Sequence, residues 1–203
     1  FIRCRNPLPY ATVANALKAS VYTDMVRDAL EEYAYDADLA GLEYNVSSSL
    51  IGLEIHLAGY NDKVSVLLEK VLTTMRDLVI KQERFTIVKE RILRGMRNYD
   101  FQQPYYQVGD FMRWLTSEKT FINDQYLAEL PHLTLEDIQS YYPQLLRQMH
   151  VETLVHGNLY KEDALRINSL IENTIRPRSL PYAEWPISRS LIFPPGGNFV
   201  YRR

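Results

Sequence analysis

The sequence predicts an α+β fold, a two-layer sandwich in which a mainly antiparallel sheet is covered on one face by long helices. Residues 50–58 alternate between apolar and polar side chains, which is typical of an antiparallel strand with one face on a core. Longer segments repeat apolar residues at the helical spacing of three and four. The order of two strands, several helices, a strand and a helix is that of a sheet layered with helices.

The clearest strand signal is a hairpin made by residues 42–46 and 50–58, which flank a serine-rich turn. In the second strand, one face is apolar, and Glu54 and His56 point to the opposite face. The predicted core-facing side chains of this strand are Ile51, Leu53, Ile55 and Leu57.

The N-terminal segment predicts a short strand and then a long helix. Residues 1–5 read as a strand, which the following Asn-Pro-Leu-Pro interrupts because proline cannot donate to a ladder. Thr12 is a plausible N-cap for a helix over residues 13–40. Gly41 stands where a left-handed residue would end that helix.

Further helices are predicted at residues 61–78, 83–101, 104–115 and 161–175. The third of them is expected to turn Val108, Phe111, Met112 and Leu115 inward. Thr134 and Asp137 resemble a capping box that starts another helix, which Pro143 must kink or restart. Residues 151–157 read as a strand.

The composition changes near the C-terminus. Five of the ten prolines fall within residues 177–195, which is typical of a linker. We therefore expect one domain over residues 1–180. Residues 181–203 are expected to be a linker and the opening hairpin of a following domain, with 190–193 and 199–202 as its strands.

Composition and charge narrow the class of protein. The net charge of −2 argues against a nucleic-acid partner, because such proteins are usually basic. No run of about 18 apolar residues is present, so we expect no membrane span. The single cysteine, Cys4, is compatible with a reducing compartment, and we expect a cytoplasmic location.

Histidines and carboxylates are the candidate metal ligands of this chain. Neither H-E-x-x-H nor H-x-x-E-H occurs. His150 and His156 fall on one predicted strand, about 20 Å apart at 3.3 Å per residue, so they cannot share an ion without a bulge or a break in the strand. The remaining hypothesis is that Glu54, His56, Glu152 and His156 converge on the polar sheet face. A hydrated face is the preferred interpretation, and no metal or catalytic residue is assigned.

Other chemistry finds no support in the sequence. There is no G-x-S-x-G elbow and no phosphate-binding glycine loop. Cys4 reads as a structural thiol, and the carboxylates of residues 31–38 read as a solvated helix face. The basic residues between 84 and 97 read as an exposed helix face. The residues alone therefore indicate a binding or scaffold domain.

Several stretches are more specific than this patterning. They are residues 28–42 (DALEEYAYDADLAGL), 59–63 (GYNDK), 84–85 and 89–90 (RF and KE), 103–105 (QPY) and 156–158 (HGN). In this order and spacing they resemble the insulysins, the pitrilysin-type inverzincin metallopeptidases, over nearly the whole chain. We expect a fungal-type homologue.

The resemblance implies a function for the parent protein. This family builds zinc metallopeptidases from four similar α+β domains, which form two halves around a chamber where peptides are cleaved. The chain looks like the third domain, and a first strand is expected to precede Phe1. The zinc would lie in the N-terminal half of the parent, and the helix containing residues 31–35 has no histidine where the zinc helix would stand. No cofactor and no catalytic residue is therefore carried onto this chain.

The resemblance also implies partners, namely the other domains of the same enzyme and its peptide substrates. The polar sheet face with Glu54, His56 and Glu152 is the expected chamber side of this domain. One alternative is a non-enzymatic scaffold of the same fold, as in respiratory-complex core proteins. A second alternative is a standalone metalloenzyme that uses the histidine and glutamate residues of the sheet.

Overall fold

The protein is described by a computed structural model, which covers residues 1–202; Arg203 lies outside the described residues. A five-stranded sheet runs in the order β2-β3-β1-β4-β5. Its strands are β1 (Ile2–Arg5), β2 (Glu43–Ser49), β3 (Gly52–Ala58), β4 (Gln148–Thr153) and β5 (Arg178–Ser179). All pairs are antiparallel except β4 with β5. The mainly antiparallel sheet predicted from the sequence is confirmed.

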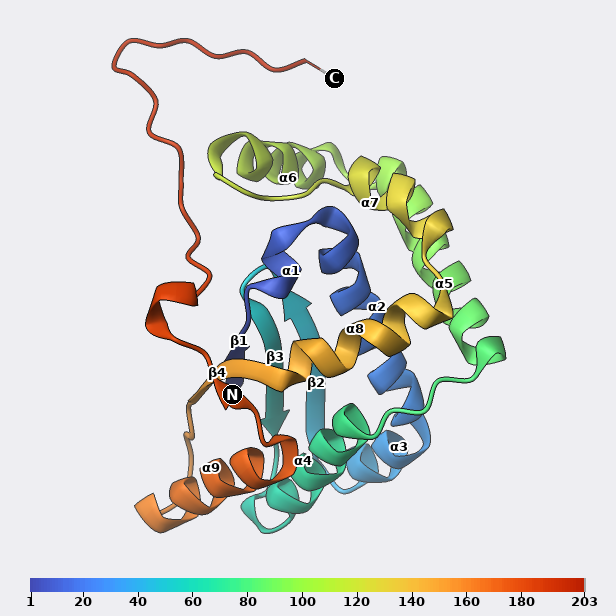
Figure 1. Cartoon of the computed structure of the whole chain (residues 1–203), viewed down its shortest axis with the longest axis vertical. Helices are drawn as coiled ribbons and strands as arrows, with labels where there is room; N and C mark the ends of the chain where they lie inside the picture. The colour runs from blue at the N-terminus through green and yellow to red at the C-terminus, as the bar shows by residue number, and fades with distance from the viewer. Residues whose placement is uncertain (203) are drawn as a thin grey trace.

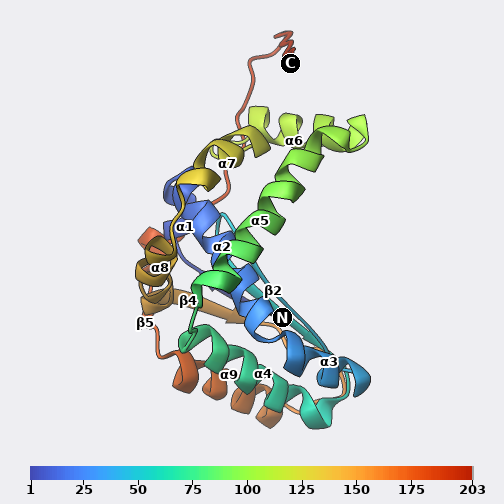
Figure 2. The ribbon, with the colours of Figure 1, turned by 90° about the vertical axis from the view of Figure 1, so that its right-hand side faces the viewer.

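Helices pack against the apolar face of this sheet and extend beyond one end of it (Figure 1). They are α1 (Leu8–Ala11), α2 (Val13–Ala29), α3 (Glu31–Leu39), α4 (Asn61–Arg76), α5 (Gln82–Arg97), α6 (Pro104–Thr116), α7 (Asn123–Glu129), α8 (Leu135–Arg147) and α9 (Lys161–Ile175). Figure 2 shows α4 and α9 side by side at the end of the molecule opposite α6.

The core lies between the apolar face of the sheet and the helices. Ile2 and Cys4 of β1 turn toward it together with Leu53 and Ile55 of β3, because alternate residues of a strand share one face. Helix α2 is the central helix of this core. The buried residues of α2 are Ala16, Leu17, Ala19, Val21, Tyr22, Thr23, Met25 and Val26.

A buried tyrosine ties α2 to α4. Tyr22 donates a hydrogen bond from its hydroxyl to the carbonyl of Met75 at 2.7 Å. Met75 lies in the last turn of α4, where carbonyl groups lack partners within the helix. The Tyr22 ring stacks on Tyr142 of α8 at 5.3 Å between centroids. One side chain therefore connects three helices.

The helix predicted over residues 13–40 is two helices. The break is at Leu30, which separates α2 from α3 and is only 1% exposed. Leu30 and Ala37 on either side of this break are both buried in the core. The prediction also missed α1, which occupies the proline-containing segment after β1.

The strand predicted over residues 151–157 begins and ends earlier. It is β4, which follows α8 directly and pairs with β1 from Ile2↔Thr153 to Arg5↔His150. His156 is therefore not on this strand, and the predicted placement of His150 and His156 on one strand is wrong. Pairing with β1 decides these bounds, because apolar patterning alone does not fix the register of a short strand.

The predictions for the helices at residues 104–115 and after Thr134 need correction, and one further helix was not predicted. Helix α6 buries none of its residues, so Val108 and Met112, expected to turn inward, are exposed. Helix α7 was not predicted. Helix α8 begins at the capping box of Thr134 as predicted and continues through Pro143 without a restart.

Candidate functional site

The face of the sheet opposite the core carries paired charges. Arg3 of β1 lies in register between Glu54 of β3 and Glu152 of β4. Arg3 Nε donates to Glu54 Oε1 at 3.2 Å. Arg5, one step along the same face, donates to both carboxylate oxygens of Glu152 at 2.8 and 3.1 Å. Two arginines and two glutamates thus form a charge-balanced row. We call this row, together with His56 of β3, the polar sheet face.

The electrostatics of this face favour the ionised form of Glu152. The Arg5 guanidinium, hydrogen-bonded to Glu152, lowers the pKa of that carboxyl below its ordinary value. A carboxylate held in this way is a poor general acid, because it stays ionised at neutral pH. The arrangement is suited to holding strands together and to presenting polar groups, and not to proton transfer.

An aromatic contact closes one side of the polar sheet face. The His150 ring stacks on Trp185 with 4.0 Å between centroids, and the Arg5 guanidinium carbon lies 5.4 Å from the Trp185 ring centre. Trp185 Nε1 donates to the Leu180 carbonyl at 3.2 Å. The segment after β5 therefore folds back over β1 and β4.

The structure brings together only part of the predicted residue set. Glu54 and Glu152 share the face on either side of Arg3, roughly 9–10 Å apart at about 4.8 Å per strand. His56 lies further along β3 and is exposed. His156 lies in the loop after β4. Among residues 1–202 no group of three or more His, Cys, Asp or Glu side chains could hold a metal ion.

Sequence reasoning missed several members of this face. Arg3 and Arg5 alternate with Ile2 and Cys4 in the first strand, and that alternation was a usable signal for them. The contact of Trp185 has no such signal, because it joins residues far apart in the chain.

A cavity lies beside the end of the sheet that carries His56. It has a volume of about 760 Å³ and is lined by the N-terminal halves of α4 and α9 and by the loop after β4. Apolar residues such as Leu68 and Ile167 form much of its wall. Asn61 Nδ2 donates to the Asn158 carbonyl at 3.3 Å across its edge. The cavity contains no nucleophile paired with a base.

The single thiol is chemically silent. Burial raises the pKa of the Cys4 thiol to about 12. The thiolate is the reactive form, so this side chain is inert at neutral pH. The donor set of the described residues does not fit a zinc ion, and no catalytic step is assigned to them.

These features define a class of protein, an α+β domain with a mainly antiparallel sheet and a helix-packed core on one of its faces. The crystal structure of pitrilysin has the same fold, with a TM-score of 0.81, 18% sequence identity, and coverage of 91% of this chain and 19% of pitrilysin. The α+β architecture is thereby confirmed.

The chain belongs to the peptidase M16 family, since the model of its middle or third domain matches residues 1–129. Human insulin-degrading enzyme is 33% identical over 202 residues, covering 98% of this chain and 20% of that protein. The A-factor-processing enzyme of Saccharomyces cerevisiae is 29% identical, covering 99% and 20%. The chain thus spans about a fifth of the length of these relatives. The predicted relation to insulysin and pitrilysin is confirmed.

No helix among residues 1–202 combines the length and the apolar character needed to cross a bilayer.

Proposed function

We propose that this chain is the non-catalytic third domain of an insulysin-like zinc metallopeptidase that degrades peptides in an enclosed chamber. The domain would provide chamber wall and surfaces for the other domains. The match of residues 1–129 to the middle or third domain of peptidase M16 carries this proposal. Zinc would be held in the N-terminal half of the parent, where it would activate the water that attacks the peptide bond.

The polar sheet face with Glu54, His56 and Glu152 is proposed as the chamber side of the domain. Its support is that these side chains lie on the face opposite the helix-packed core. Arg3 and Arg5 neutralise the two carboxylates, so the face would contact peptides without favouring one sign of charge. His56 is the exposed member and would contact a peptide first.

The proposal includes the domain limits and the location. Residues 1–180 would form the domain, and residues 181–203 would lead into the next one. Among the described residues 199–202 no strand is present, so a hairpin there would require the rest of the parent. A cytoplasmic location is proposed for the parent, supported by the single unpaired cysteine.

Peptidase activity of the full-length parent tests the function. We expect the purified protein to contain zinc and to cleave a quenched fluorogenic peptide, and a chelator to abolish the cleavage. A parent without zinc and without cleavage would contradict the proposal and would favour the scaffold alternative.

Protection by a bound peptide tests the chamber side. In the full-length parent kept inactive by a chelator, the thiol of His56→Cys should react with maleimide more slowly when peptide substrate is in excess. His132→Cys is the matched control, because His132 is exposed outside the sheet and should react at the same rate with and without peptide. Equal reactivity of the thiol at position 56 under both conditions would reject the chamber assignment.

A further inference from the structure

The polar sheet face carries two large apolar side chains at one end. Phe1 is 37% exposed and Leu154 is 64% exposed. Phe1 lies two positions before Arg3, so its side chain shares the face of Arg3 and not the buried face of Ile2. Leu154 lies two positions after Glu152 and shares its face for the same reason. Both apolar side chains therefore point away from the helix-packed core.

Backbone hydrogen bonds hold these two residues side by side. The Phe1 nitrogen donates to the Leu154 carbonyl at 2.9 Å, and Leu154 N–H donates to the Phe1 carbonyl at 2.8 Å. Residues that exchange both bonds lie directly opposite each other in an antiparallel ladder, so their side chains are neighbours on one face. The Arg3 guanidinium carbon lies 5.3 Å from the centre of the Phe1 ring. We call Phe1 and Leu154 the apolar pair.

His56 lies on the other side of Phe1 and is exposed. Ile2 pairs with Ile55 of β3, so the next step along the ladder brings Phe1 level with His56. Neighbouring strands are about 4.8 Å apart. The imidazole, the Phe1 ring and the Leu154 side chain therefore follow one another across three adjacent segments of the sheet, and together they offer an aromatic and aliphatic surface to water.

We propose that the apolar pair and His56 form a subsite for a large apolar side chain of a peptide. The charges of the adjacent arginine and glutamate row balance one another, so that row gives a peptide little preference by charge. The apolar pair supplies the preference instead, because a peptide ring packed on Phe1 and Leu154 buries apolar area and gains ring contacts at about 4.5–7 Å between centroids. This inference rests on the proposed function, since it takes the polar sheet face as the chamber side.

Peptide binding to the full-length protein, kept inactive by a chelator, tests the inference. Two fluorescent peptides of equal length and charge are compared, one with phenylalanine and one with serine at its centre. The unmodified protein should bind the phenylalanine peptide at least about threefold more tightly, and Leu154→Ser should remove most of this preference. Leu165→Ser is the matched control and should keep it, because Leu165 is 57% exposed on α9, a helix of the core side. Equal affinity for the two peptides, or an undiminished preference in Leu154→Ser, would overturn the proposal.

Photocrosslinking then locates the bound side chain. A peptide with a photoreactive phenylalanine at its centre should crosslink to the tryptic fragment 148–161, which contains Leu154. Absence of this fragment from the crosslinked products would overturn the proposal. Neither measurement uses cleavage, so a protein that binds peptides through Leu154 and does not cleave them would contradict only the proposed peptidase function. A protein that cleaves peptides and binds them independently of Leu154 would contradict only the subsite.

Discussion

Gly52 begins β3 at the point where this strand passes closest to β1. It lies opposite Arg5 in the ladder and has a φ of +140°, a conformation that side-chain-bearing residues rarely adopt. A Cβ atom added here would lie 1.9 Å from the carbonyl oxygen of Cys4. The backbone of β1 would have to move to accommodate it.

Gly52→Ala should therefore lower the free energy of unfolding by more than about 3 kcal/mol, through strain and loss of β1 pairing. Urea denaturation measures the effect. Gly95→Ala is the matched control, because Gly95 lies within α5 with nothing within 4 Å of the added carbon. That change should stabilise the chain by about 0.5–1 kcal/mol. If the Gly52→Ala protein is as stable as wild type, the close approach of Gly52 to the Cys4 carbonyl of β1 is wrong.

The residue scale also accounts for the inert character of the polar sheet face. The hydrogen bond from Arg5 lowers the pKa of Glu152, so this carboxyl is not held in the raised-pKa state that acid catalysis needs.

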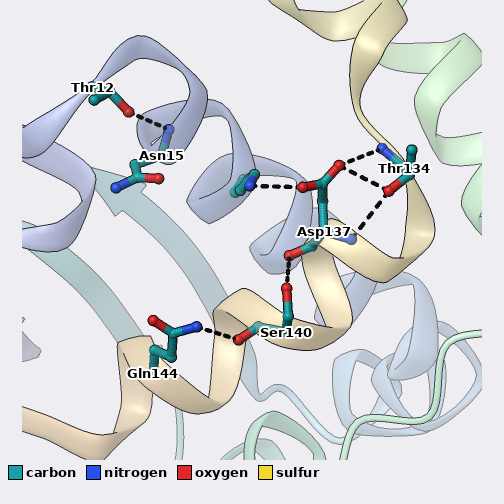
Figure 3. Close-up of polar contacts among 7 residues, drawn as sticks. Thr12, Asn15, Thr134, Asp137, Ser140 and Gln144 are labelled. Atoms are coloured by element: carbon teal, nitrogen blue, oxygen red, sulfur yellow. Dashed lines mark hydrogen bonds and ion pairs between the residues drawn. The ribbon is translucent and has the colours of Figure 1, made fainter.

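At the scale of elements, the start of α8 joins local capping to a tertiary ion pair (Figure 3). Thr134 Oγ1 accepts from Asp137 N–H at 3.2 Å, and Asp137 Oδ2 accepts from Thr134 N–H at 3.0 Å. Asp137 Oδ1 also accepts from Lys18 of α2 at 2.8 Å. The same carboxylate therefore caps one helix and fixes it to the central one.

Asp137 should make stability depend on pH. The hydrogen bond from Lys18, then that from the Thr134 backbone, lowers the Asp137 pKa from 3.8 to about 2. A lowered folded pKa means that the stabilisation is complete above about pH 4 and is lost as pH falls toward 2. Asp137→Ala should lower the free energy of unfolding by about 1–2 kcal/mol at pH 7, and the difference from wild type should shrink below pH 4.

Glu136→Ala is the control for this prediction. It removes a carboxylate from the same first turn of α8 and leaves the capping box in place. The loss of free energy of unfolding in Glu136→Ala, measured by chemical denaturation, should be less than half the loss in Asp137→Ala. A loss in Asp137→Ala that stays constant from pH 7 to pH 2 would contradict the role given to the ionised carboxylate.

At the scale of the whole molecule, the C-terminal segment contributes unequally along its length. Residues 178–185 add β5 to the sheet, bury Leu180 to 4% exposure, and place Trp185 on His150. Residues 188–202 are exposed throughout and contact mainly α6. The first part packs on the sheet, and the second lies along α6.

Two truncations should separate these parts. Removal of residues 188–203 should change the free energy of unfolding by less than about 0.5 kcal/mol, because it uncovers no buried side chain. Removal of residues 178–203 should cost about 3 kcal/mol, since it also removes the burial of Leu180 and the Trp185 stack. Thermal and urea unfolding of both proteins measure the difference. Equal losses of free energy of unfolding in the two truncated proteins would show that residues 178–187 do not stabilise the domain.

Local patterns were sufficient wherever one element carried its own signal. Period-two alternation identified the β2–β3 hairpin, although the predicted serine turn is wrong because Ser47–Ser49 belong to β2 and the turn lies at residues 50–51. The Thr134 box located the start of α8. The motifs at residues 28–42 and 59–63 indicated the family that the match over residues 1–129 confirms. Such features depend on neighbours within a few residues, so the sequence encodes them directly.

Other features were decided only by contacts between distant segments. The break at Leu30, the bounds of β4 and the exposure of α6 depend on what each element packs against, which apolar periodicity does not specify. The pairing of Arg3 with Glu54 and of His150 with Trp185 joins residues 51 and 35 positions apart. The sequence by itself determined the fold class, most of the longer elements, the absence of the zinc motifs and the family. The tertiary structure decided register, burial and the composition of the polar sheet face, because these follow from the free energy of packing the whole chain.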